Sequence, residues 1–467
     1  MLVEQLYTNC LAQGAYLIAS DGEAAIVDPL RETKPYLDLA QKHGVKIKYI
    51  LETHFHADFV SGHVDLAQKT GAQIVFGPGA QTTYKSVSAA DGQEFKLGKL
   101  TIKVLHTPGH TPESVCYLLL DENRKPHSVY TGDTLFIGDV GRPDLAIKSD
   151  LTQEDLAGML YDSLRSKLMT LPDDVIVYPA HGAGSACGKN MSKETFDTLG
   201  NQKKTNYALS NMSREAFIKE LTSGILPAPQ YFAKNAALNK NGYNSFDDVM
   251  QKGNKGLSVA EFESLTSKGA LVLDVRKPAE FAAGHVPGAL FIGIDGQFAP
   301  WVGAIITNLH QQIILVTPAG REQETVMRLS RVGYDNCVGF LAGGFDAWKS
   351  AGKHVATIKS IPAQEFADAY AHNGINTLDV RKPGEYEAKH LSKVLAKPLD
   401  FIADWHDGLD KDKTYYIHCA GGYRSMIAAS IMQANGYKSL IDVAGGFGAI
   451  VKTSLPEEDY VCTCSNA

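Results

Sequence analysis

The sequence contains few cysteines, no long apolar run and no excess of basic residues. Its seven cysteines are widely spaced and odd in number, which is not the pattern of a disulfide framework. We therefore expect free thiols in a reducing, cytoplasmic compartment. No stretch of about 18 consecutive apolar residues occurs, so no membrane span is expected. The formal net charge of −7 offers no basic surface that would neutralise nucleic-acid phosphates.

The chain has 467 residues, which at roughly 100–200 residues per domain is enough for several domains. Residues 1–16 are acidic and mixed in polarity, so we expect a first strand there and not a signal peptide. Over about 1–240, short apolar runs that end in His, Asp or Gly alternate with helical segments at 33–43 and 151–168. This alternation predicts a layered α/β domain with functional loops at the strand ends.

An internal repeat begins near residue 258. LVLDVRKPAEFAAGHVPGAL at 271–290 matches NTLDVRKPGEYEAKHLSKVL at 376–395, 105 residues later. AGGF at 342–345 recurs at 444–447, 102 residues later. A period of about 100 residues is too long for a solenoid unit, so the repeat predicts two duplicated domains.

These patterns divide the chain into four parts. The predicted parts are an N-terminal α/β domain at 1–240, two duplicated α/β domains at 258–352 and 360–455, and a C-terminal tail at 456–467. The segment 241–257 is rich in Gly, Asn and Lys and is the predicted linker.

Four polar motifs follow apolar runs in the N-terminal domain. They are HxHxD with His54, His56 and Asp58, then PGHT with His110, TGD with Asp133, and PAHG with His181. A single histidine after a strand usually has a structural role. Four such motifs in succession, made of imidazoles and carboxylates, predict a metal site.

The order of these motifs resembles the metallo-β-lactamase superfamily over about 1–200. The resemblance implies a four-layer αβ/βα sandwich with metal at one rim of its sheets. Dinuclear zinc hydrolases of this superfamily, such as glyoxalase II, have HxHxDH, and here the last position is Phe59. A phenyl ring offers no lone pair, so one ligand of a second metal is missing. Asp58 and His181 could still hold a weak second ion.

Two longer motifs resemble the persulfide dioxygenase branch of the superfamily: HFHADFVSG at 54–62 and GDTLFIGDVGRPD at 132–144. The resemblance implies one Fe(II) per chain, held by His54, His110 and Asp133. Two histidines and one carboxylate suit non-haem Fe(II) and leave positions open for O₂ and substrate. The resemblance also implies that three neighbouring residues orient the ligands and balance their charge. These are His56, Asp58 and His181. Arg142, in the GRPD turn, could fix a nearby carboxylate or anion, or it could form only a structural salt bridge.

The implied activity is oxidation of a low-molecular-weight thiol persulfide by O₂, which yields sulfite and the thiol. Glutathione, coenzyme A and other small thiols all remain possible carriers. The family resemblance also implies a homo-oligomer. No nucleic acid or membrane partner is expected.

A second constellation lies in the C-terminal repeat, between the predicted strand TYYIH and the helical segment MIAASIMQANGY. It comprises Cys419, Gly421, Gly422, Tyr423, Arg424 and Ser425. A cysteine in a glycine-containing loop at a helix start lies where backbone N–H groups stabilise a thiolate, and Arg424 adds positive charge. With DVRxPxEY upstream and AGGF downstream, this loop resembles a rhodanese. The resemblance implies that Cys419 accepts sulfane sulfur and passes it to a nucleophile.

The first repeat has the same frame without this chemistry. Alignment places Thr317 at the cysteine position and Glu322 at the arginine position. A hydroxyl is a poorer sulfur acceptor than a thiolate, and Glu322 would repel an anion. We therefore expect a degenerate rhodanese-like domain that serves packing, spacing or substrate access. Cys337 is expected in its core.

Three cysteines stay ambiguous. Cys187 follows His181 by six residues and is a candidate sulfur relay near the metal rim. Cys462 and Cys464 are expected in the tail, although a CxC pair could also serve redox chemistry or sulfur relay.

The two chemistries suggest a coupled pathway of persulfide detoxification. A rhodanese can join sulfite and sulfane sulfur into thiosulfate, and the reverse direction, persulfide from thiosulfate, stays open. Two other functions also stay open. A dinuclear zinc thioesterase would hydrolyse a thioester without O₂, and Phe59 counts against it. A non-catalytic persulfide carrier or sensor would need only Cys419, and the complete metal motifs count against it.

Overall fold

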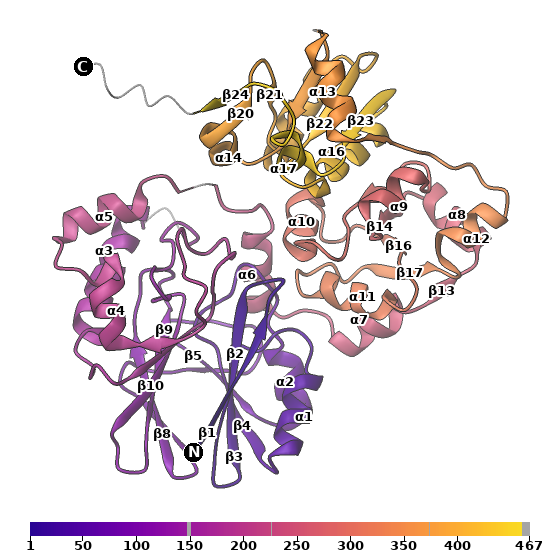
Figure 1. Ribbon diagram of the computed structural model, residues 1–467. Helices are drawn as coiled ribbons and strands as arrows, with labels where there is room; N and C mark the ends of the chain where they lie inside the picture. Colours follow the sequence, from indigo (N-terminus) through magenta and orange to yellow (C-terminus); the bar gives the residue numbers. More distant parts are fainter. Residues whose placement is uncertain (147–150, 226, 373, 460–467) are drawn as a thin grey trace, which may run out of the picture. The chain divides into compact units, whose positions relative to one another are not determined.

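The computed structural model describes residues 1–146, 151–225, 227–372 and 374–459. The chain forms two compact units (Figure 1). The first comprises 1–248 with 329–335, and the second comprises the rest of the chain. Among the residues described, no helix has both the length and the apolar character needed to cross a membrane.

The first unit contains two six-stranded sheets. One sheet runs in sequence order: β1 (Leu2–Thr8), β2 (Gln13–Ser20), β3 (Glu23–Val27), β4 (Lys46–Leu51), β5 (Gln73–Phe76) and β6 (Val87–Ser88). The other runs in reverse order: β12 (Asp197–Thr198), β11 (Ile176–Pro179), β10 (Pro126–Gly132), β9 (Val115–Leu120), β8 (Leu100–His106) and β7 (Glu94–Leu97). Strand β2 is buried along its whole length, whereas the edge strand β7 alternates exposed and buried residues.

Helices cover the outer face of each sheet (Figure 1). Those of the first unit are α1 (Lys34–Lys42), α2 (His63–Thr70), α3 (Gln153–Ser163) with η1 (Leu164–Leu168), α4 (Leu199–Thr205), η2 (Tyr207–Leu209), α5 (Arg214–Thr222) and α6 (Phe232–Asn241). Helix α3 begins at a capping box, in which the Thr152 side chain accepts from the Asp155 N–H and the Asp155 side chain accepts from the Thr152 N–H.

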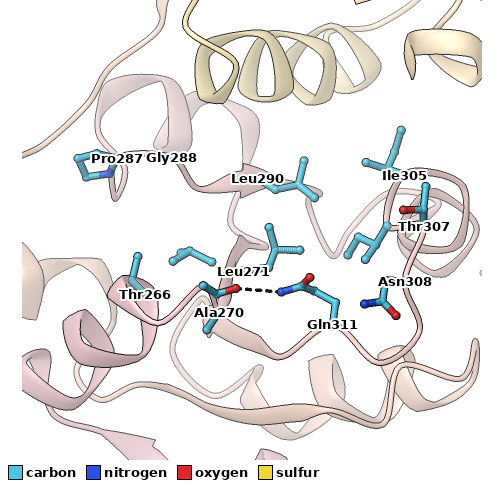
Figure 2. Close-up of a pocket in the computed structure, with 13 residues that line it drawn as sticks. Thr266, Ala270, Leu271, Pro287, Gly288, Leu290, Ile305, Thr307, Asn308 and Gln311 are labelled. Carbon is cyan, nitrogen blue, oxygen red and sulfur yellow. Dashed lines mark hydrogen bonds between the residues drawn. The ribbon is translucent and has the colours of Figure 1, made fainter. Parts of the chain in front are cut away.

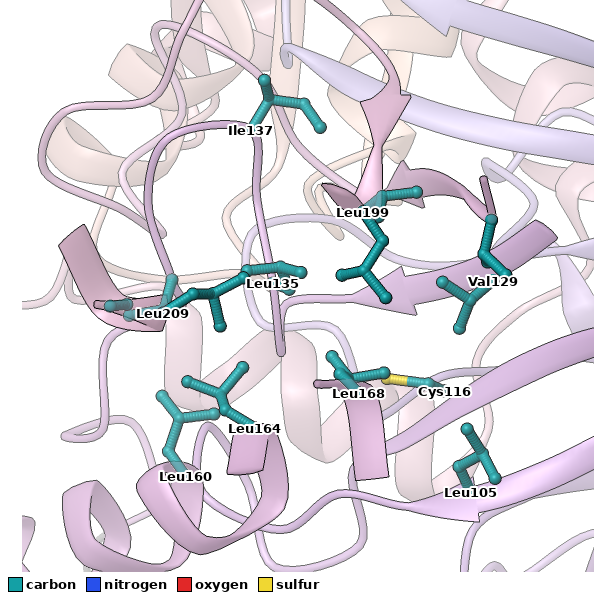
Figure 3. Close-up of a cluster of buried hydrophobic side chains, with 14 of the residues drawn as sticks. Leu105, Cys116, Val129, Leu135, Ile137, Leu160, Leu164, Leu168, Leu199 and Leu209 are labelled. Atoms are coloured by element: carbon teal, nitrogen blue, oxygen red, sulfur yellow. The ribbon is translucent and has the colours of Figure 1, made fainter. Parts of the chain in front are cut away.

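Among the described residues, three hydrophobic clusters hold these layers together. One lies between the two sheets and includes Val27 and Val104. A second packs α1 and α2 on the first sheet. The third packs Leu160 and Leu164 against the second sheet, where Cys116 and Val129 face them (Figure 3). The result is the αβ/βα sandwich predicted from the motifs.

The second unit contains two five-stranded sheets with the same strand order. The first is β13 (Gly256–Leu257), β17 (Cys337–Leu341), β16 (Ile313–Val316), β14 (Leu271–Asp274) and β15 (Leu290–Phe291). The second is β18 (Lys359–Ile361), β23 (Ser439–Val443), β22 (Thr414–His418), β19 (Asn376–Asp379) and β21 (Leu395–Ala396). The pairings within each sheet are all parallel. The predicted duplication is therefore a duplication of topology.

The helices of the second unit follow the same repeat. They are α8 (Val259–Ser267), α9 (Pro278–Ala283), α10 (Phe298–Ile305), α11 (Glu322–Ser330) and α12 (Gly344–Ser350) in the first half, then α13 (Ala363–Ala371), α14 (Pro383–Ala388), η3 (Leu399–Phe401), α15 (Ile402–Trp405), η4 (His406–Gly408), α16 (Tyr423–Ala434) and α17 (Gly446–Ile450). Cys337 is fully buried in β17, as expected of a core residue, and burial raises its pKa to about 12.

Two segments differ from expectation. The predicted linker 241–257 contains a helix, α7 (Phe246–Gly253), because Val249 gives its polar sequence a buried side. The predicted tail begins with a strand, β24 (Glu457–Asp459), which pairs antiparallel with β20 (Lys389–Leu391). Cys462 and Cys464 lie outside the described residues.

The first rhodanese-like sheet has a cavity of about 460 Å³ at the amino ends of its strands. Its lining includes Leu271 at the start of β14 and Leu290 of β15 (Figure 2). Gln311 Nε2 donates to the Gly269 carbonyl at 3.1 Å beside it. Because Thr317 follows β16 at the carboxyl end of the sheet, this cavity lies at the opposite end from the degenerate loop.

Candidate active sites

The ends of four strands bring the metal motifs to one rim of the sandwich. His54 follows β4, His110 follows β8, Asp133 follows β10 directly, and His181 follows β11. All four side chains are buried, with at most 2% exposure. Burial of so many titratable groups costs folding free energy unless they pair with one another or with a cation.

Three of these side chains converge as a metal ligand set would. The Nε2 atoms of His54 and His110 lie 3.9 and 3.5 Å from Oδ2 of Asp133. That Oδ2 atom is buried and has no hydrogen-bond partner in the structure. A cation between two imidazole nitrogens and one carboxylate oxygen would satisfy all three atoms, so the donor set fits a divalent metal.

The second ring nitrogen of His54 and of His110, Nδ1, contacts an oxygen atom on the side away from the Asp133 carboxylate. His54 Nδ1 lies 3.0 Å from Oγ1 of Thr53, and His110 Nδ1 lies 2.8 Å from the Arg142 carbonyl. Asp28 in turn accepts hydrogen bonds from both the N–H and the hydroxyl of Thr53 at 2.8 Å. Partners of this kind fix the ring orientation and leave Nε2 for the metal.

The ionisation state of His54 suits a metal ligand. Burial, followed by the nearby His56, lowers the pKa of His54 well below its ordinary value. The neutral imidazole therefore keeps a lone pair available at neutral pH.

His181 bridges two carboxylates beside this set. Its Nδ1 lies 2.7 Å from Oδ1 of Asp133, and its Nε2 lies 2.8 Å from Oδ2 of Asp58. Burial alone would lower the pKa of His181, but Asp133 and Asp58 outweigh it and raise that pKa well above the ordinary value. Burial alone would raise the pKa of Asp133, and His181 outweighs it and keeps the carboxylate ionised. His181 thus orients Asp133 by one oxygen and leaves the other free.

His56 belongs to a separate buried cluster. Its Nε2 lies 3.1 Å from Asp28 Oδ1 and 3.7 Å from Glu52 Oε2. Phe59 stacks on the His56 ring, with centroids 4.4 Å apart. Burial, followed by the nearby Asp28, raises the pKa of Glu52 well above its ordinary value. His56 therefore adjoins the ligands in two ways, through Asp28 and through its ring, whose centroid lies 4.2 Å from that of His54.

Two further residues shape the metal rim. Asn239 of α6 donates to the carbonyls of His56 and Phe59 at 2.7 and 2.8 Å, which pins the HxHxD loop. Gly141 is required because a Cβ there would lie 2.0 Å from the Asp133 carbonyl oxygen.

Cys187 and Arg142 also lie at this rim. The ligand atoms of Cys187, Asp58 and His181 all lie within 4.8 Å of one another. Arg142 makes a bidentate pair with the carboxylate of Asp144, at 2.6 Å for both bonds. The Arg142 N–H also donates to the Cys187 carbonyl at 3.0 Å.

The rhodanese loop lies between β22 and α16. Cys419 is buried, and the Gly422 N–H donates to its Sγ at 3.1 Å. Its thiol lies 3.6 Å from Oγ of Ser425, which donates to Asp442 at 2.7 Å. The cysteine is thus at the start of a twelve-residue helix, where backbone N–H groups favour an anionic sulfur.

Arg424 is held in place by an acidic partner. It makes a bidentate pair with Glu385, at 2.5 and 2.8 Å. This hydrogen bonding lowers the pKa of Glu385 despite partial burial. Glu385 belongs to the repeated DVRxPxEY motif, so that motif supports the loop.

The degenerate repeat places Thr317 after β16, as β22 places Cys419. Glu322 opens α11, and its Oε1 accepts from the Gly320 N–H at 3.2 Å. A carboxylate thus occupies the helix start that Arg424 occupies in the other repeat. The five cysteines among the described residues are all free thiols.

Sequence reasoning missed three residues that support the metal site: Asp28, Thr53 and Asn239. Asp28 had a usable signal, because it ends the apolar run AAIV just as Asp133 ends SVYTG. Asn239 had none, since it lies in a helix far along the chain.

Comparison with known proteins agrees with this architecture. The metallo-β-lactamase superfamily model matches residues 9–181, and the rhodanese-like domain model matches residues 258–351 and 362–453. The chain is 30% identical to the human mitochondrial persulfide dioxygenase ETHE1 over 241 residues, which cover 49% of this chain and 84% of that protein.

Two further relatives are informative. A crystal structure of a metallo-β-lactamase from Staphylococcus aureus matches with a TM-score of 0.64 and 32% identity, covering 73% of this chain and 98% of that one. A probable hydroxyacylglutathione hydrolase of Schizosaccharomyces pombe is 34% identical over 172 residues, which cover 36% of this chain and 62% of that protein. The hydrolase match is thus confined to a shorter stretch than the dioxygenase match. The chain belongs to the persulfide dioxygenases of the metallo-β-lactamase superfamily, in a form fused to two rhodanese-like domains.

Proposed function

We propose that this protein uses iron to oxidise a small thiol persulfide with O₂ and converts the sulfite formed to thiosulfate at Cys419. The first reaction is RSSH + O₂ + H₂O → RSH + SO₃²⁻ + 2H⁺. The observation that carries the proposal is the convergence of His54 and His110 on the unpartnered oxygen of Asp133, with Phe59 where a second metal would need a ligand.

His54, His110 and Asp133 would hold the iron. When bound there, Fe(II) would supply the redox chemistry that O₂ activation requires and that zinc lacks. The protein's own part is orientation: Thr53 and the Arg142 carbonyl hold the two imidazoles, and His181 holds the carboxylate.

Asp58 and His181 support a single-metal site. His181 Nε2 lies 2.8 Å from Asp58 Oδ2, and this ion pair would have to open before both atoms could bind a second ion. Cys187, beside them, remains a candidate sulfur relay. A Cys187→Ser variant that oxidises persulfide at the wild-type rate would remove that role.

The rhodanese step follows from the Cys419 loop. RSSH passes its outer sulfur to the Cys419 thiolate and leaves as RSH. Sulfite then attacks that sulfur, and thiosulfate leaves with regeneration of the thiolate. Fusion of both activities in one chain raises the effective concentration of sulfite at Cys419 if the linkers can span the sites.

We propose the division 1–240, 258–352 and 360–455 for the three domains. Product analysis with a synthetic persulfide as sole sulfur source tests the coupling. Thiosulfate is expected from the wild type and sulfite from Cys419→Ser. Sulfite without thiosulfate from the wild type would favour the reverse direction, in which the rhodanese makes persulfide for the iron site.

The zinc thioesterase is the second candidate, and the hydroxyacylglutathione hydrolase match favours it. It predicts two metals per chain and thioester hydrolysis without O₂ uptake. A persulfide carrier without catalysis would show neither O₂ uptake nor hydrolysis. An oxygen-electrode trace with a persulfide identifies the dioxygenase, and a thioester hydrolysis assay separates the other two.

A further inference from the structure

Tyr423, which lies between Gly422 and Arg424 in the cysteine loop, contacts the degenerate repeat. The Tyr423 hydroxyl donates to the Gly293 carbonyl at 2.6 Å, 130 residues earlier in the chain. Its ring also packs edge-to-face on Phe291, with centroids 6.0 Å apart. Gly293 and Phe291 both lie in the segment FIGIDG at 291–296, which begins at the last residue of β15 and continues into the loop after it.

This segment is shaped to receive the tyrosine. A Cβ on Gly296 would lie 2.4 Å from Cζ and 2.5 Å from Cε2 of Tyr423. The Gly296 backbone has no positive φ, so space for the ring, and not backbone conformation, requires glycine there.

The contact continues along one face of α16. Ser430, seven residues after Tyr423, accepts from the Phe291 N–H at 3.0 Å. Gln433, three residues further, lies 2.8 Å from Nε2 of His285. Residues at these spacings share one side of a helix, so the helix that begins in the cysteine loop rests on the degenerate repeat.

We propose that the degenerate rhodanese-like domain acts as a scaffold that holds the cysteine loop of the active domain in place. Tyr423 is the positioning residue, and it binds to the segment 291–296. Gly422 precedes Tyr423 and donates to the Cys419 sulfur, and Arg424 follows it and pairs with Glu385. Anchoring the tyrosine therefore restrains both groups that surround the sulfur. The first repeat has Thr317 in place of the catalytic cysteine, and a structural role of this kind requires its fold but not a cysteine.

The inference rests on the proposed role of Cys419 in sulfur transfer. The main test is Gly296→Ala in the full-length protein, assayed for thiosulfate:cyanide sulfurtransferase activity. We expect kcat to fall on the order of tenfold or more, because an ångström-scale misplacement of reacting groups is costly. KM and persulfide-dependent O₂ uptake should change little. Tyr423→Phe, which removes only the hydroxyl, should lower kcat about two- to tenfold.

Two measurements separate positioning from general damage. In a Tyr423→Ala background, which removes the ring that the new methyl group would strike, Gly296→Ala should have almost no further effect. The rate of Cys419 alkylation by iodoacetamide should fall in Gly296→Ala at unchanged melting temperature. Gly256→Ala in the same repeat is the matched control, because its Cβ would meet nothing closer than 3.5 Å.

The outcomes are distinguishable. If Cys419→Ser is inactive but Gly296→Ala and Tyr423→Ala retain wild-type kcat, the scaffold role is wrong and the proposed rhodanese function stands. If Cys419→Ser retains sulfurtransferase activity, the proposed function itself is wrong. Should Gly296→Ala not fold, the two Tyr423 variants, which add no atoms, decide the question alone.

Discussion

His181 Nδ1 lies 2.7 Å from one carboxylate oxygen of Asp133, and the other oxygen has no hydrogen-bond partner among the residues described. The same imidazole reaches Asp58 with its second nitrogen at 2.8 Å. In the proposed single-metal site, His181 therefore orients the ligand Asp133 and is not itself a ligand.

The contact of His181 with Asp133 predicts a measurable effect on metal affinity. His181→Ala should weaken Fe(II) binding about 10- to 100-fold, because loss of a partner that orients a ligand typically has that effect. Anaerobic competition with a chromogenic chelator measures it. His127→Ala, which removes an imidazole that lies 3.2 Å from Ser128 outside the site, is the control and should bind iron normally. Unchanged Fe(II) affinity in His181→Ala would show that the contact of His181 with Asp133 does not contribute to metal binding.

Phe59 predicts the number of metals. Phe59→His should restore a ligand of the second site and raise the zinc content toward two ions per chain, while Phe59→Leu should not. Persulfide-dependent O₂ uptake should fall in Phe59→His, because a second ion would draw Asp58 and His181 away from their present pairing. Metal analysis after dialysis against zinc gives the answer. Two ions in the wild type would contradict the single-metal site.

Arg424 predicts a strong difference between two similar substitutions. Arg424→Lys should lower sulfurtransferase kcat/KM by about tenfold or more, since a lysine cannot reproduce the bidentate pair with Glu385. Arg124→Lys disrupts a similar but exposed pair with Glu94 and should be silent in the same assay. Equal effects of both variants would argue against a role for the Arg424 geometry.

The degenerate loop predicts that a cysteine alone is not sufficient. In a Cys419→Ser background, Thr317→Cys should not accumulate a persulfide when mixed with thiosulfate, because Glu322 places negative charge at the helix start. Adding Glu322→Arg should increase the persulfide fraction seen by intact-mass spectrometry. A persulfide in Thr317→Cys alone would mean that charge at this position is unimportant.

The sequence was sufficient to predict the sandwich, the duplication and the side chains that converge at each site. The sandwich and the ligand set were implied by the resemblance of the motifs to known families, and the duplication was predicted from the internal repeat. The sequence was insufficient where the decisive contacts join distant segments. Asn239 pins the HxHxD loop from 180 residues away, counted to Phe59, and Tyr423 reaches Gly293 across 130 residues. Neither pair leaves a local pattern.

The division of labour between His56 and His181 was also beyond the sequence. Both were expected to surround the ligands. The His56 ring centroid lies 4.2 Å from that of His54 and His56 Nε2 faces Asp28 and Glu52, whereas His181 contacts Asp133 itself. Loop conformation decides which nitrogen faces which carboxylate. The helix α7 in the predicted linker is a similar case, because its polar composition hid a short buried face.

The most direct test combines metal analysis of anaerobically purified protein with an oxygen-electrode trace on a synthetic persulfide. The account predicts one iron per chain, held by His54, His110 and Asp133, and one O₂ consumed for each sulfite equivalent formed. Full activity of a zinc-only protein that hydrolyses a thioester and consumes no oxygen would contradict it.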